Sequence, residues 1–372
     1  MRKAAIITIP LQYLLSNYGS FFQHYALREV LKRIGISSVR LPYCGEPFSD
    51  RKWLYLSLRR FIGNSIRRIR GMELVRLDVP SGRFERDYKS MIGPLRESCS
   101  GEEDVAIVGS DQIWQSVSPT AWLRGFPTIK RISYAASSDW NRCMGEESWR
   151  EGVMRHYPTM TGISVREEAG INAFTTMGLN NPKAVCVCDP TTLLQKADYL
   201  RIADHHKAFE APTLLCYFVN ERLPVLKVER LAEELNVQLR ILGIQGAEKA
   251  VPSKYLLRLT PRQFLSAMRD AKYLVTNSYH GLLFSLYFEK EFLFVQQSSR
   301  SVKSQNVRQR EILTRYGLTD RELSVESEVE ECADLLRKKV NWKDVSSRMM
   351  LFRRFSYEWL EDQICGRDVN AR

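Results

Sequence analysis

The sequence repeatedly places a short β-prone run directly before a polar turn, and most of these turns lead into a stretch with helical periodicity. In the clearest case, residues 272–276 form the β-prone run, 277–281 form an Asn-Ser-Tyr-His-Gly turn, and 282–288 are apolar. Five predicted strands in the first half also end in polar turns, at 3–9, 104–108, 131–135, 162–165 and 185–188, and no Asn-Gly hairpin signal separates them. This order predicts an α/β fold with doubly wound parallel sheets.

The strand–turn–helix alternation stops at a polar segment, residues 195–212, and restarts with a predicted strand at 213–219. A chain of 372 residues is also long for a single core. We therefore predict two Rossmann-like domains, residues 1–195 and 196–341, whose parallel sheets face a cleft. An amphipathic helix at 342–365 is expected to return to the first domain.

The formal net charge is +12, which favours nucleic acid, an anionic membrane surface or an anionic small substrate as partner. No nucleic-acid-binding motif is present, so no nucleic acid is expected. Residues 51–70 hold seven Arg and Lys side chains, no acid, and apolar residues at helical spacing. Such a helix can contact a membrane peripherally, or it can be a solvated helix whose apolar stripe packs on the domain.

The eight cysteines are scattered, and the only close pair, Cys186 and Cys188, would point to opposite faces of a strand. No metal site is therefore expected, and a reduced, cytoplasmic protein is the simplest interpretation. No run of about 18 apolar residues predicts a membrane span. The N-terminus lacks the long apolar region of a signal peptide and is interpreted as a first strand.

Four residues in or next to the turns after predicted strands are candidate site residues. His280, one of five histidines, lies in the turn before a predicted helix, whose N-terminus favours an anion, although a lone His is often structural. Gly19, at the start of the first predicted helix, permits close backbone approach to a phosphate or sugar, or lies in a simple connection. Asp111 follows a buried-type strand. Arg166 has an unfavourable charge for a helix N-terminus, so it is expected to reach for an anion or an acid.

Six segments together carry a resemblance to a known family. They are Asn17-Tyr-Gly-Ser-Phe-Phe-Gln-His-Tyr-Ala-Leu27, Val108-Gly-Ser-Asp-Gln-Ile-Trp114, Ser133-Tyr-Ala-Ala-Ser137, Ile163-Ser-Val-Arg-Glu167, Asp189-Pro-Thr191 and Thr276-Asn-Ser-Tyr-His-Gly-Leu-Leu-Phe-Ser285. In this order and at these intervals the chain resembles the polysaccharide pyruvyl transferase family over about residues 1–316.

The resemblance implies a fold similar to that of GT-B glycosyltransferases, with the acceptor on the N-terminal domain and the donor on the C-terminal domain. It implies a reaction in which the enolpyruvyl group of phosphoenolpyruvate, the donor substrate, moves to a sugar, forms a pyruvate ketal and releases phosphate. The acceptor would be a saccharide of a capsule, exopolysaccharide or cell-wall glycan, in some cases lipid-linked at the inner face of the membrane. No step requires a metal or redox cofactor.

The expected site residues follow from the resemblance and from the chemistry of the donor. His280 is the expected general acid/base, and Asp111 is expected to orient or deprotonate an acceptor hydroxyl. The residues expected to bind the anionic donor are Arg166, Asn277, Ser278, Gly281, Asn306 and Arg308. The residues expected on the acceptor side are Asn17, Gly19, Gln23 and Ser110. Related chains commonly carry Asp at the position of Asn277.

Two other functions fit parts of the pattern. A GT-B-type glycosyltransferase using a sugar nucleotide would share the architecture, and it would need an acid for the ribose, for which Asp270 and Glu289 are the nearest candidates. A non-catalytic partner in polysaccharide assembly would dock through residues 51–70, but it would have no need of Arg166 and His280.

Overall fold

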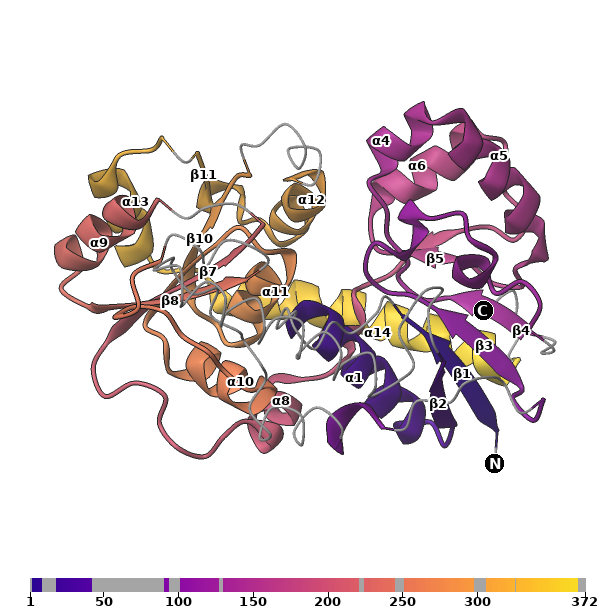
Figure 1. Ribbon diagram of the computed structural model, residues 1–372, viewed down its shortest axis with the longest axis horizontal. Helices are drawn as coiled ribbons and strands as arrows, with labels where there is room; N and C mark the ends of the chain where they lie inside the picture. Colours follow the sequence, from indigo (N-terminus) through magenta and orange to yellow (C-terminus); the bar gives the residue numbers. More distant parts are fainter. Residues whose placement is uncertain are drawn as a thin grey trace, which may run out of the picture.

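The computed structural model describes residues 2–8, 18–41, 90–93, 101–126, 130–220, 224–244, 251–297, 306–324 and 326–366. Each half of the chain builds a parallel sheet, and the two sheets form separate lobes (Figure 1). Asn17 and the basic segment 51–70 lie outside the described residues, so the predictions made for them stay predictions. No helix in the described part of the chain is long and apolar enough to cross a membrane.

The first lobe is built on the strand order β2-β1-β3-β4, and all of its pairs are parallel. A short parallel pair, β5-β6, continues from β4 through the isolated bridges Ile132–Gly162 and Ala136–Val165. The elements of this lobe are β1 (Lys3–Ile7), α1 (Tyr18–Arg33), β2 (Ser37–Leu41), β3 (Val105–Val108), β4 (Lys130–Ser133), α4 (Trp140–Gly145), α5 (Glu147–His156), β5 (Ser164–Val165), α6 (Glu168–Thr176), β6 (Val185–Cys186) and α7 (Pro190–Leu193).

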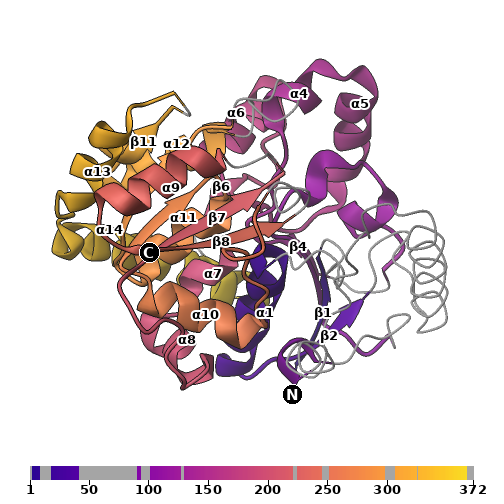
Figure 2. The same cartoon turned by 60° about the vertical axis from the view of Figure 1, so that its left-hand side comes forward.

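The second lobe is built on the strand order β11-β10-β9-β7-β8, also parallel throughout. Its elements are β7 (Thr213–Val219), α9 (Val225–Glu234), β8 (Gln238–Ile244), α10 (Pro261–Asp270), β9 (Tyr273–Thr276), α11 (Tyr279–Tyr287), β10 (Glu291–Val295), α12 (Asn306–Tyr316), β11 (Glu322–Leu323) and α13 (Val329–Arg337). Alternate residues of β7 pack into two different cores. Figure 2 shows α9 and α13 on one side of this sheet and α10 on the other. The predicted α/β fold with parallel sheets is confirmed.

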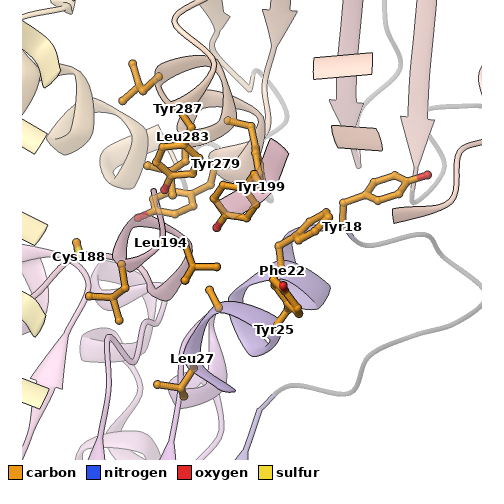
Figure 3. Packing of buried hydrophobic residues seen from close by; sticks show 14 of the residues in the cluster. Tyr18, Phe22, Tyr25, Leu27, Cys188, Leu194, Tyr199, Tyr279, Leu283 and Tyr287 are labelled. Atoms are coloured by element: carbon orange, nitrogen blue, oxygen red, sulfur yellow. The ribbon is translucent and has the colours of Figure 1, made fainter. Parts of the chain in front are cut away.

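An aromatic core joins the two lobes along α1 (Figure 3). The ring of Tyr18 stacks on that of Phe264 from α10 at 4.4 Å, and Phe22 meets Phe284 of α11 edge-on at 5.3 Å. All nine residues of α11 are buried, which agrees with its apolar sequence. Aromatic rings bury large areas, so this contact holds the N-terminus of α1 against the second lobe.

The long helix α14 (Trp342–Cys365) contacts both lobes (Figure 1). Near its middle, the ring of Phe352 lies under the guanidinium of Arg315 from α12 at 4.1 Å. One turn on, Ser356 accepts a hydrogen bond from the backbone N–H of Cys188, and near the end Lys130 donates to the carbonyl of Gln363. The domain limits predicted from the sequence stay a prediction.

The polar segment 195–212, where the strand–turn–helix alternation was predicted to stop, contains the helix α8 (Lys196–Ile202). A capping box between Gln195 and Asp198 starts this helix, and its Tyr199 is buried and stacks on Tyr287 at 5.7 Å. A helix of seven residues with one buried aromatic residue gives too weak a periodicity to be predicted.

Candidate active site

The turn after β9 is fixed by local hydrogen bonds and by a close backbone approach. Ser278 caps α11 and accepts a hydrogen bond from the N–H of Gly281 at 3.2 Å. A Cβ at Gly281 would lie only 2.2 Å from the hydroxyl oxygen of Thr276, so glycine is required there. The Asn277 amide accepts from the N–H of Val219 at 2.8 Å and donates to its carbonyl at 3.0 Å. The turn is thus tied to β7, and His280 projects from the first turn of α11.

His280 of the second lobe meets Asp189 of the first lobe. The side chain of His280 is 9% exposed, and its Nε2 lies 3.6 Å from Oδ2 of Asp189, within ion-pair distance but beyond a hydrogen bond. Burial works to raise the pKa of Asp189, but His280 and Arg166 outweigh it and hold the pKa well below its ordinary value. This carboxylate therefore stays ionised at neutral pH.

Arg166 is buried between two carboxylates rather than exposed to a ligand. Its Nε donates to Glu167 at 2.9 Å and its Nη1 to Asp189 at 3.0 Å, while its guanidinium carbon lies 3.9 Å from the centre of the Tyr279 ring. Burial alone would lower the pKa of Arg166, but Tyr279, Glu167 and Asp189 raise it well above its ordinary value. Of the three guanidinium nitrogens of Arg166, only Nη2 has no hydrogen-bond partner among the described residues.

Arg308 supplies a second cation beside the same ring. It lies on α12, is 7% exposed, and its guanidinium carbon is 5.9 Å from the centre of the Tyr279 ring. Burial and the neighbouring charge of Arg166 lower its pKa, although Glu167 and Asp111 act against them. Two cations beside one buried tyrosine form an environment that favours an additional anion. Asn306, at the start of α12, is bound to the backbone N–H and carbonyl of Gln297.

The turn after β3 contributes Ser110 and Asp111. Asp111 adopts a left-handed conformation (φ 61°) and accepts a hydrogen bond from the hydroxyl of Ser20 at 2.9 Å. Burial works to raise its pKa, but Arg166, His280 and the Ser20 hydroxyl lower it overall. Ser110 is fully buried and lies 3.0 Å from Asp189, and its N–H donates to Gln23 at 3.0 Å.

Gly19 allows α1 to approach the catalytic candidate. A Cβ on Gly19 would lie 2.1 Å from Nδ1 of His280, so any side chain there would displace the imidazole ring. The ring is therefore enclosed by Gly19 on one side and by Asp189 on the other.

The structure brings most of the expected residues together in one cluster, and the contacts of each residue decide which role it can have. His280, Asp111, Arg166, Arg308, Gly19 and Ser110 form one cluster at the carboxyl ends of strands from both sheets. The side chains of Asn277 and Asn306 bind backbone groups, and Gln23 and Ser110 are buried against each other. Asp189, Glu167 and Tyr279 also belong to the cluster, although they were not predicted as site residues. Asp189 follows a predicted strand in the same way as Asp111 does, and that position is the signal that could have found it.

No group of three or more His, Cys, Asp and Glu side chains in the described part of the chain is arranged to hold a metal ion. The expectation of a metal-free reaction stays a prediction. A groove of about 630 Å³ lies between α1 and α8, apart from the cluster, and no residue named above as a cluster member lines it. Its Asp198 is already paired with Arg33 at 2.8 Å. The chemistry is therefore assigned to the cluster and not to this groove.

Comparison with solved structures defines the class of fold. UDP-GlcNAc 2-epimerase of Methanocaldococcus jannaschii, in complex with UDP-GlcNAc and UDP, has 13% sequence identity and a TM-score of 0.51, with 96% of this chain and 100% of that chain covered. S. aureus MnaA with UDP has 11% identity and a TM-score of 0.53, with 98% and 96% covered. At such identities these likenesses show the fold alone, which is of the GT-B type.

The sequence itself defines the family. The model of the family described as polysaccharide pyruvyl transferase matches residues 17–299, and the chain belongs to this family. The match includes the turns that carry Asp111, Arg166, Asp189 and His280. The search of the curated proteins found no match.

Proposed function

We propose that this protein transfers the enolpyruvyl group of phosphoenolpyruvate to two hydroxyls of a saccharide, forming a pyruvate ketal and releasing phosphate. The observation that carries the proposal is the contact between His280 and Asp189, at 3.6 Å, in a cluster that also holds two buried arginines. Membership of the pyruvyl transferase family supports this reaction class over the other transferases that share the fold.

The donor carries a phosphate and a carboxylate, and two features of the cluster suit such an anion. Nη2 of Arg166 and the guanidinium of Arg308 lie around the Tyr279 ring. The first amides of α11, at Tyr279 and His280, have no acceptor within the helix and favour negative charge at this end. We assign donor binding to these groups, while Asn277, Ser278, Gly281 and Asn306 hold the surrounding backbone in place.

The reaction requires two proton transfers. One acceptor hydroxyl bonds to C2 of the donor while the methylene carbon C3 takes a proton and becomes a methyl group. The second hydroxyl then bonds to C2, the bond from C2 to the phosphate oxygen breaks, and phosphate leaves. The two hydroxyl protons end on the methyl group and on the phosphate. An imidazole suits such transfers near neutral pH, so His280 is assigned as the general acid/base.

Asp111 and Ser20 suit the acceptor hydroxyls. Their hydrogen bond at 2.9 Å lies at the start of α1, next to Gly19, and the lowered pKa of Asp111 keeps its carboxylate ready to accept a hydrogen bond. The acceptor is assigned as a saccharide of a surface polysaccharide or its lipid-linked precursor. A peripheral membrane contact through residues 51–70 and a cytoplasmic location remain predictions.

The test uses the purified full-length protein with phosphoenolpyruvate and a panel of free and lipid-linked oligosaccharides. We expect acceptor-dependent release of phosphate and a product with the mass of an added pyruvate ketal. Thermal shifts with phosphoenolpyruvate and with a panel of sugar nucleotides separate the proposal from a glycosyltransferase. Stabilisation by a sugar nucleotide alone, without phosphate release from phosphoenolpyruvate, would overturn it.

A further inference from the structure

The carboxylate of Asp189 is held in place by contacts to both oxygens, and its Oδ2 also lies next to His280. Oδ1 accepts from the N–H and the hydroxyl of Thr191, at 2.9 and 2.7 Å. Oδ2 lies 3.0 Å from the Ser110 hydroxyl and 3.0 Å from Nη1 of Arg166, and it is also the atom nearest to Nε2 of His280. The side chain is fully buried, so water does not compete for it.

The imidazole of His280 has a buried nitrogen without a hydrogen bond. Nε2 is buried and has no partner at hydrogen-bond distance in the described structure, while its distance to Asp189 is 3.6 Å. A buried polar nitrogen is costly to leave unpaired, and hydrogen bonds of catalytic groups commonly shorten when substrate binds. Gly19 packs against the other side of the ring and limits its movement away from Asp189.

We propose that Asp189 is the positioning residue for His280: it accepts a hydrogen bond from Nε2–H and so fixes the tautomer that presents Nδ1 for proton transfer. This inference rests on the proposed function for the identity of the reaction. It places Asp189 outside direct contact with substrate. The pair joins the two lobes, because Asp189 follows β6 and His280 begins α11.

Glu167 provides a matched control within the same cluster. Its side chain is as buried as that of Asp189. Both acids bind Arg166, Glu167 at 2.9 Å and Asp189 at 3.0 Å. Glu167 accepts its other hydrogen bonds from the Ser137 hydroxyl and the Trp140 indole N–H, and among the described residues it forms none with His280. Replacing either acid by its amide therefore removes one negative charge beside Arg166, but only Asp189→Asn removes the charged acceptor beside His280.

The experiment compares wild type, Asp189→Asn and Glu167→Gln in phosphate release from phosphoenolpyruvate and acceptor, with thermal unfolding alongside. We expect Asp189→Asn to lower kcat by at least 100-fold, with KM changed less than threefold. The fold-loss of kcat in Glu167→Gln should be at least ten times smaller than the loss in Asp189→Asn. Equal losses of kcat in the two variants would overturn the proposal, because they would reduce Asp189 to a partner of Arg166.

A second measurement does not depend on how well Asp189→Asn and Glu167→Gln fold or on the identity of the reaction. In wild-type protein labelled with ¹⁵N-histidine, the His280 signal, assigned by its loss in His280→Gln, is expected to show the Nε2–H tautomer. An Nδ1–H tautomer would overturn the role of Asp189. Absence of pyruvyl transfer by the wild type together with the Nε2–H tautomer would overturn the proposed function and leave the positioning role standing.

Discussion

The two lobes contribute different chemistry to the same site. The first lobe supplies charges that are already paired: the side chains of Arg166, Glu167 and Asp189 are at most 1% exposed and bind one another. The second lobe supplies Tyr279 and His280 from a helix that is otherwise apolar, and Arg308 from the helix beside it. The first lobe therefore fixes the electrostatic field, and the second brings the group that moves protons.

This division has a consequence for how the site is assembled. Buried ion pairs are rigid because separating them leaves an uncompensated charge, so the first lobe can hold its charges in place before the second lobe docks. His280 depends on docking through the aromatic core around Tyr18 and Phe264. Two backbone amides of α6, at Glu168 and Ala169, also bind the carboxylate of Glu311 from α12. Substitutions of the charged residues in the first lobe should therefore mainly lower stability, and substitution of His280 in the second lobe should mainly lower kcat.

The largest effect is expected from the proton-transfer group of the second lobe. His280→Ala should lower kcat by roughly 10²–10⁴-fold, the usual contribution of a general acid/base. Folding should change less than activity, because Nε2 of this side chain has no partner at hydrogen-bond distance among the described residues. Steady-state phosphate release and thermal unfolding check both parts. His205→Ala, at an exposed histidine, is the control expected to keep wild-type turnover. Turnover within threefold of wild type in His280→Ala would remove His280 from the mechanism.

Removing the central cation of the first lobe should cost stability instead. Arg166→Ala leaves Glu167 and Asp189 without their shared partner, and breaking a buried pair in this way costs about 3–5 kcal/mol. Urea unfolding at pH 7 measures the loss.

Arg308 is the matched comparison for Arg166. Its pKa is lowered, so its surroundings disfavour its charge in the absence of an anion, whereas those of Arg166 favour the charge. We therefore expect Arg308→Ala to destabilise the fold much less and to raise the KM for phosphoenolpyruvate at least tenfold. Equal destabilisation by the two variants would contradict the assignment of Arg308 to the donor.

A second histidine shows how burial changes the pKa of an imidazole that lies beside a backbone carbonyl and not beside an acid. His24 of α1 is fully buried, its Nε2 lies 3.3 Å from the carbonyl of Ile92, and burial together with Arg40 lowers its pKa to about 3. The folded protein thus holds His24 neutral, while the unfolded chain binds a proton near the ordinary value of 6.5. Its contribution to stability is complete above pH 6.5 and is lost as the pH falls toward 3.

Urea unfolding between pH 7.5 and 4 tests this dependence. The wild type should lose on the order of 3 kcal/mol more stability than His24→Gln over that range, since each pKa unit corresponds to about 1.4 kcal/mol. The glutamine amide can still donate to Ile92, which makes this variant the control for the lost hydrogen bond. Parallel pH dependence of the two proteins would show that His24 does not titrate on unfolding.

The sequence predicts local structure well where the signals are local. Thr260 followed by Pro261 is a local signal for the start of a helix, and Thr260 caps α10 by a capping box with Gln263. The strand and the helix around His280 are also as predicted, except that the turn is shorter, because α11 begins at Tyr279 within the predicted turn 277–281. Asp189 was missed because its local signal, an acid before Pro190, is fully explained by the helix cap that it also forms. Its contact with His280 depends on how the lobes pack, which no local pattern encodes.

The smallest effect is expected at Asn277, the position at which the family resemblance implies Asp. The Asn277 amide both accepts from the N–H of Val219 and donates to its carbonyl, so an aspartate could keep only the first bond and would face the carbonyl with a like charge. Asn277→Asp should cost about 1–3 kcal/mol of stability, the cost of an unsatisfied buried acceptor, and should change kcat less than threefold. Thermal unfolding and phosphate release measure the two quantities. A tenfold change in kcat at unchanged stability would instead make residue 277 a partner of His280 in proton transfer, and the second lobe would then supply an acid of its own.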